Sequence, residues 1–156
     1  MTGRYTHQIG TLSMSGDLPQ GIPTYAQALQ KAGYHTAGIG KFHWLQTWQW
    51  AAPVGVGVDL AALHDELAGY GFDEVWEATG KQLATHNFCD WCAHLQDKGI
   101  LDAYRQHAVT RGRNFMTADE TEFSGEPWPF EEADYVDIVT ADRITESIRN
   151  RPQDKP

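Results

Sequence analysis

Apolar residues near the start of the chain recur with helical spacing and are followed by a short run of small residues. Thr24 can cap a helix over residues 25–32, in which the apolar side chains at i, i+3, i+4 and i+7 are Tyr25, Ala28, Leu29 and Ala32. Gly33 then ends the pattern. After Thr36, residues 37–40 are only alanine, glycine and isoleucine, which is typical of a buried parallel strand. The pattern predicts a helix followed by a strand over residues 36–40.

The remaining two thirds of the chain also mix helical and strand patterns. We expect a short helix over residues 60–67, a strand over 72–76 and helical structure from His86 to about Tyr104. An irregular, acidic stretch should reach Phe130, before a last helix from Glu131 or Ala133 to Asn150. Its apolar stripe would consist of Tyr135, Ile138, Val139, Ile144 and Ile148, with Asp142 among them. Together these elements predict an α/β protein.

The predicted strand over residues 36–40 delivers a lysine and a histidine two positions apart. Lys41 and His43 follow its carboxyl end. In open α/β sheets ligands bind in the crevice outside the carboxyl ends of the strands. This stretch is therefore expected to form an anion-binding site.

Composition and charge narrow the possible functions. The chain has 156 residues, of which 41% are hydrophobic and 12% aromatic, enough for one folded domain. Its 12 basic and 21 acidic residues leave a net charge of −9, which argues against a nucleic-acid partner. An anionic substrate would have to be held by local positive charges. No apolar run is long enough for a membrane span.

Two motifs carry a family resemblance. Residues 33–43 match all six fixed positions of the second sulfatase signature, G-Y-x-T-x-x-x-G-K-x-H, through Gly33, Tyr34, Thr36, Gly40, Lys41 and His43. The start of the chain is similar to the end of the first sulfatase signature, C/S-x-P-x-R-x-x-x-L-x-T-G, at Thr2 and Gly3, and Arg4 and His7 fit what usually follows. The chain thus resembles the formylglycine-dependent sulfatases, with gaps, over nearly its whole length.

The resemblance implies an alkaline-phosphatase-like α/β/α sandwich with a mostly parallel sheet. Residues 1–156 would be part of its N-terminal catalytic domain, cut at both ends, with Met1 an internal methionine. The cysteine or serine that becomes formylglycine would lie ten residues before Thr2, and the calcium ligands would also lie outside the chain. The expected activity is hydrolysis of a small-molecule or carbohydrate sulfate ester, and the chain alone should be inactive and poorly stable. A phosphonate monoester or phosphodiester hydrolase of the same superfamily is the alternative enzyme.

The resemblance also implies roles for individual residues. Lys41 would bind the sulfate oxygens and stabilise their developing charge, and His43 would take a proton from the hydrated formylglycine. Arg4, Thr36 and Gly40 would support the site, whereas His7 could lie behind the nucleophile or on the surface. Trp44, with Trp48 and Trp50, could form an aromatic wall for the organic part of the substrate or pack in the core.

One cluster suggests a different class of protein. His86, Cys89, Cys92 and His94 are ligand types that suit zinc, as in a small zinc-binding interaction module. On a helix, however, His94 would lie on a different side from the other three, and a disulfide between the two cysteines would be poorly placed. We therefore expect no metal ligands in this chain, with the cysteines packed as small apolar side chains.

Overall fold

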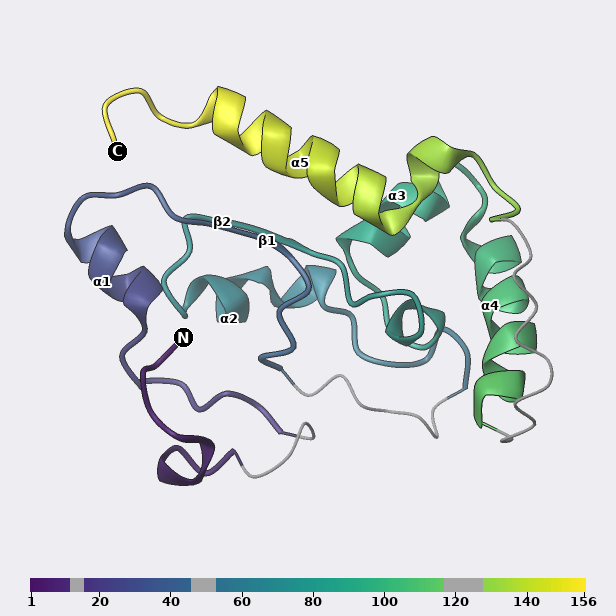
Figure 1. Ribbon diagram of the computed structural model, residues 1–156, viewed down its shortest axis with the longest axis horizontal. Helices are drawn as coiled ribbons and strands as arrows, with labels where there is room; N and C mark the ends of the chain where they lie inside the picture. Colours follow the sequence, from purple (N-terminus) through teal and green to yellow (C-terminus); the bar gives the residue numbers. More distant parts are fainter. Residues whose placement is uncertain (12–15, 46–52, 117–127) are drawn as a thin grey trace.

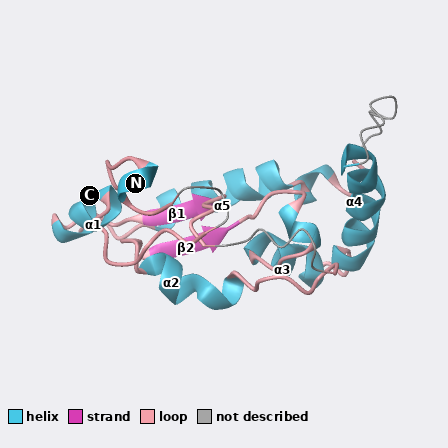
Figure 2. Cartoon of the chain, turned by 90° about the horizontal axis from the view of Figure 1, so that it is seen from below, coloured by secondary structure: helices cyan, strands magenta, loops and turns pink. Residues whose placement is uncertain are grey.

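A parallel pair of strands forms the centre of the computed structural model, which describes residues 1–11, 16–45, 53–116 and 128–156 (Figure 1). Strand β1 (Ala37–Gly40) pairs with strand β2 (Glu74–Glu77) in a register that sets Ala37 beside Glu74 and Gly40 beside Glu77. Figure 2 shows the two strands side by side and pointing the same way. The predicted α/β class is confirmed.

Helices lie on both sides of this sheet. Helix α5 (Val136–Asn150) packs against β1, and helix α2 (His64–Ala68) packs against β2 from the other side (Figure 1). The remaining helices are α1 (Tyr25–Lys31), α3 (Asp90–Asp97) and α4 (Leu101–Met116). Short 3₁₀ helices occur at Thr6–Gln8, Ala61–Leu63, Leu83–Thr85 and Glu132–Asp134. None of the described helices has the length and apolar character that a membrane crossing needs.

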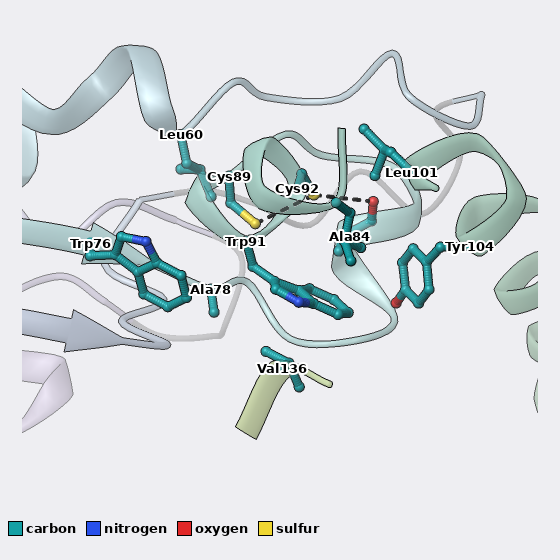
Figure 3. Close-up of a cluster of buried hydrophobic side chains, with 11 residues drawn as sticks. Leu60, Trp76, Ala78, Ala84, Cys89, Trp91, Cys92, Leu101, Tyr104 and Val136 are labelled. Carbon is teal, nitrogen blue, oxygen red and sulfur yellow. Dashed lines mark hydrogen bonds between the residues drawn. The ribbon is translucent and has the colours of Figure 1, made fainter. Parts of the chain in front are cut away.

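The buried side chains form two clusters. The larger lies between β2, α3, α4 and the start of α5 and includes Trp76, Trp91, Leu95 and Tyr104 (Figure 3). The smaller lies beside α1 and α2 and is built on Ala26, Leu67, Tyr70 and Phe72. The sheet is therefore anchored by separate clusters of apolar side chains.

Helix α1 was predicted correctly, but its buried face was not. Thr24 caps the helix, with its Oγ1 accepting a hydrogen bond from Gln27 N at 3.1 Å. Of the expected apolar face, Tyr25 and Leu29 are exposed, whereas Ala26 is buried. The reason is a close backbone approach, in which a Cβ atom on Gly71 would lie only 2.3 Å from Gln27 N. A small residue is needed on the packed side, and the larger side chains face outward.

The apolar stripe expected on α5 is also partly wrong. Ile138, Ile144 and Ile148 are exposed, and the buried positions are Val136 and Ser147. Ser147 donates a hydrogen bond to Glu74 Oε2 at 2.6 Å, so α5 meets the sheet partly through a polar contact. Of the expected stripe, Val139 does pack against the larger cluster, so hydrophobicity alone identified the packed side of this helix only in part.

Other element boundaries differ from the prediction as well. The helical stretch expected from His86 to Tyr104 is two helices, broken at Gly99, whose φ of 71° is left-handed. Helix α4 continues to Met116, through a segment expected to be irregular, because Leu101, Tyr104 and Ala108 share a packed side.

Candidate functional site

A pocket of about 560 Å³ lies at the carboxyl ends of the two strands. Its floor comes from the end of β1 and from the segment after β2, and one wall comes from the first turns of α5. The lining includes Gly40, Lys41, Thr79, Gly80, Lys81, Asp137 and Thr140. This is the position where ligands bind in open parallel sheets. The structure therefore places a cavity where the sequence predicted an anion-binding site.

Lys41 lines this pocket, and its side chain extends across Gly80. A Cβ atom on Gly80 would lie 3.6 Å from Lys41 Nζ and 3.5 Å from Cδ, which is ordinary contact distance. Gly80 has a φ of 84°, which glycine adopts readily and other residues rarely do. The lysine is exposed, so its ammonium group is accessible to an anion in the pocket.

A second lysine, which the sequence analysis missed, lines the same pocket. Lys81 donates a hydrogen bond to the Tyr135 hydroxyl and lies 4.1 Å from the centre of its ring. A signal was present, because a Gly-Lys pair lies at the end of β1, at Gly40-Lys41, and a second one follows shortly after β2, at Gly80-Lys81. Asp137, in the first turn of α5, provides negative charge in the same lining.

His43 leaves the same strand end as Lys41 but does not line the pocket. Its backbone has a φ of 60°, in the left-handed region that non-glycine residues seldom occupy. Residues held in this way cost about 1–3 kcal/mol and cluster at functional sites. The strain is therefore consistent with a functional role for the His43 segment.

Glu77, at the end of β2, holds this strained segment, and it was also missed. Its carboxylate accepts hydrogen bonds from the backbone amides of Phe42 and His43. Only 2% of the residue is exposed, and Oε2 has no hydrogen-bond partner among the described residues. Burial, with the nearby Cys89 thiol as the next cause, raises the pKa of Glu77 to about 8. Nothing in the spacing of the sequence distinguishes this glutamate from a surface residue.

Thr36 and Gly40 lie at opposite ends of β1. Thr36 donates two hydrogen bonds to Asp73 Oδ2, from its backbone N at 3.0 Å and its hydroxyl at 3.1 Å. Asp73 N donates in return to the Thr36 carbonyl at 2.7 Å, so this pair joins the beginnings of both strands. Gly40 has a φ of 123° and accepts a hydrogen bond from Ala78 N at 2.9 Å. Through these backbone hydrogen bonds, Thr36 and Gly40 help to hold β1 and β2 together beside the pocket.

The structure does not bring Arg4, His7 or Trp44 into the pocket lining. Arg4 and His7 are exposed in the N-terminal segment, where His7 stacks on Tyr5. Trp44 stacks on Phe42 and Phe72, with ring centres 4.5 and 5.2 Å away. Its placement favours core packing over a substrate wall. Trp48 and Trp50 lie outside the described residues.

The proposed four-residue zinc site does not form. His94 Nε2 is 2.8 Å from Asp134 Oδ1, on the side of α3 that faces the start of α5, and Cys89 and Cys92 are buried beside each other. Throughout the described ranges, no group of three or more histidine, cysteine, aspartate or glutamate side chains is arranged to hold a metal ion. The described residues therefore do not support a zinc module, and the calcium ligands that the family resemblance implies would lie outside the chain.

Comparisons with known proteins place the whole chain in one family. The family model described as "Sulfatase" matches residues 1–156. Searches of curated proteins and of solved structures gave no match.

Proposed function

This chain belongs to the sulfatase family, and we propose that it supplies the sulfate-binding lysine of an enzyme that hydrolyses sulfate esters. The observation that carries the proposal is the position of Lys41, with its side chain across Gly80 in a pocket at the carboxyl ends of two parallel strands. The substrate would be a small-molecule or carbohydrate sulfate ester.

Lys41 would act on the sulfate group itself. An ammonium fixed against the sulfate oxygens stabilises the negative charge that builds there as the ester bond breaks. Lys41 follows the end of β1 and its ammonium lies beside Gly80, so its charge belongs to the pocket lining. The overall charge of −9 repels anions, so binding would depend on Lys41 and Lys81.

His43 would act as the proton acceptor in this reaction. A histidine titrates near neutral pH and can take the proton of a hydrated formylglycine when the covalent sulfate leaves. Glu77 fixes the backbone of His43, which limits the positions that its ring can take. In this proposal Glu77 is a positioning residue.

The nucleophile and the cation would be provided by other residues. By the motif register, the residue that becomes formylglycine would lie ten positions before Thr2. A calcium ion would take its ligands from outside the described residues, which contain no suitable cluster. The 156 residues alone should therefore bind a sulfate weakly and turn over none.

The test uses the protein as its gene encodes it, produced in a host that makes formylglycine. We expect it to hydrolyse 4-nitrophenyl sulfate with a higher kcat/KM than a phenylphosphonate monoester or bis(4-nitrophenyl) phosphate. A preference for either phosphorus ester would instead support the alternative hydrolase. Hydrolysis of none of the three would overturn both assignments.

A further inference from the structure

Two cysteines lie in contact at the beginning of α3, outside the pocket. Cys89 is the residue before the first turn of the helix and Cys92 lies within that turn. Their sulfur atoms are 3.5 Å apart, and both residues are fully buried. Figure 3 shows the pair among apolar side chains, with a dashed line joining the sulfurs. The sequence-based objection to a disulfide assumed that both cysteines lie inside a helix, and Cys89 does not.

The polar groups around the two sulfurs are different. The Thr79 hydroxyl donates to Cys89 Sγ at 3.6 Å, which suits a sulfur carrying negative charge. Cys92 Sγ instead faces two backbone carbonyl oxygens, of Ala84 at 3.7 Å and Asn87 at 3.6 Å, which suit a protonated thiol. Two cysteines that served only as small apolar packing residues would not need such different hydrogen-bond partners.

The pKa values of the two thiols differ in the direction that these partners predict. The hydrogen bond with Cys92 lowers the pKa of the Cys89 thiol, and contacts with Thr79 lower it further against the effect of burial. The hydrogen bond with Cys89, followed by burial, raises the pKa of the Cys92 thiol. A thiolate before a helix, next to a second thiol in a Cys-x-x-Cys spacing, is the arrangement found in reactive dithiols.

We propose that Cys89 and Cys92 form a dithiol that hydroperoxides oxidise to an intramolecular disulfide, with Cys89 as the attacking sulfur. The Cys89 thiolate attacks one oxygen of hydrogen peroxide, the O–O bond breaks, and the hydroxide released takes a proton to become water. The sulfur of Cys92 then attacks the sulfur of the Cys89 sulfenic acid. The S–O bond breaks, and the departing hydroxide takes the Cys92 proton as a second water. Two thiols lose two electrons, and one peroxide is reduced to two waters.

Burial determines which oxidants can react. Neither cysteine has exposed surface, so a small hydroperoxide can reach Cys89 through local opening more easily than a bulky disulfide such as oxidised glutathione. The disulfide closes a loop of only four residues, so its effect on the free energy of unfolding should be small. The proposal is independent of the sulfate-ester reaction.

The experiment follows the reduced 156-residue chain in a slight excess of hydrogen peroxide. Intact mass should show the loss of two hydrogen atoms, and both thiols should become inaccessible to alkylation after denaturation. Cys92→Ser should stop at a sulfenic acid on Cys89, trapped by dimedone. Cys89→Ser should react about tenfold more slowly, because the remaining thiol of Cys92 stays buried against two carbonyl oxygens that favour its protonated form. In urea the two single-cysteine variants should react at similar rates.

Three results would overturn the proposal. Two free thiols could remain after prolonged exposure to peroxide, or the folded Cys89→Ser and Cys92→Ser variants could oxidise equally fast. One zinc ion per chain, bound through both thiols in the purified protein, would also overturn it and would favour a metal module. Far-UV circular dichroism of both variants checks that the rates are those of folded protein.

Discussion

The side-chain carboxyl group of Glu77 accepts a hydrogen bond from the backbone amide of His43. The last residue of β2 therefore holds the segment that follows β1, the neighbouring strand. His43 is held at a φ of 60°, a strained conformation that needs such support. The charge state of Glu77 and the geometry of the Lys41 segment are therefore linked.

The first prediction concerns pH and Glu77. Its folded pKa of about 8 lies above the ordinary value of 4.5, so the folded state holds this proton more tightly than the unfolded state. The free energy of unfolding should therefore fall as the pH rises from about 4.5 through about 8, by roughly 3–5 kcal/mol in total. Urea denaturation at a series of pH values measures this decrease.

Glu77→Gln is the matched variant for that prediction. Glutamine keeps a hydrogen-bond acceptor for the two amides but cannot ionise, so the part of the decrease that belongs to Glu77 should disappear. The difference between the two proteins is the proper readout, because the lowered pKa of Cys89, about 6, makes its own contribution to stability rise with pH over part of the same range. Parallel pH profiles for the two proteins would contradict the assignment.

The second prediction is that Lys41→Ala lowers turnover of a sulfate ester about 100-fold or more in the active enzyme. The ammonium contributes mainly in the transition state, so kcat should fall more than KM rises. Lys41 is exposed, and the free energy of unfolding should hardly change. Lys31→Ala, at the exposed end of α1, is the control and should leave kcat unchanged. A near-normal kcat in Lys41→Ala would remove Lys41 from the mechanism.

The third prediction compares two glycines with left-handed backbones. Gly71→Ala should destabilise the fold by roughly 2–4 kcal/mol, because the new Cβ atom would lie 2.3 Å from Gln27 N in α1. Gly99→Ala should lower the free energy of unfolding by about 1 kcal/mol, since no described atom lies within 4 Å of its Cβ position. Thermal or urea unfolding gives both values. Equal losses would mean that the contact between α1 and Gly71 is looser than described.

The fourth prediction concerns Thr36. Thr36→Val removes the hydroxyl that donates to Asp73 and should lower the free energy of unfolding by about 1–2 kcal/mol. The pKa of Asp73 is lowered chiefly by the hydrogen bond from the Thr36 backbone, then by Gln30. Its contribution to stability is therefore present above about pH 4 and is lost as the pH falls through the folded pKa. The variant should retain most of this acid sensitivity, because the backbone donor remains, and complete loss of it would contradict this order of causes.

Local sequence signals predicted correctly which segments form helices and strands, but they predicted poorly which side of each helix is buried. The Thr24 cap and the small residues of β1 depend only on near neighbours, and both features were predicted. The exposure of Leu29 and Ile148 could not be predicted in the same way. The packed side of α1 depends on its close approach to Gly71, and that of α5 on the hydrogen bond between Ser147 and Glu74. These partners are more than 40 positions apart in the sequence.

The position of the pocket was predictable where a motif marked the strand end. Lys41 lies at the predicted strand end, in a pocket that the spacing of Gly40 and Lys41 anticipated. Glu77 was not predictable, because its importance comes from burial beside Cys89 and from contacts with backbone amides across the sheet. A carboxyl group that binds backbone amides needs no particular residue type as its partner, so no sequence motif identifies it.

Asp73 and Glu77 clamp the two strands at their two ends, and this has a consequence for how such enzymes can diversify. Because the strand register is fixed by these contacts, the connection between the strands can vary without displacing Lys41, provided that the buried side chains of Leu60, Leu67 and Tyr70 are kept. Insertions there would alter what surrounds the pocket while Lys41 stays in place. Transplanting this connection between members of the family is therefore a way to change what the pocket accepts while the strand pair is kept.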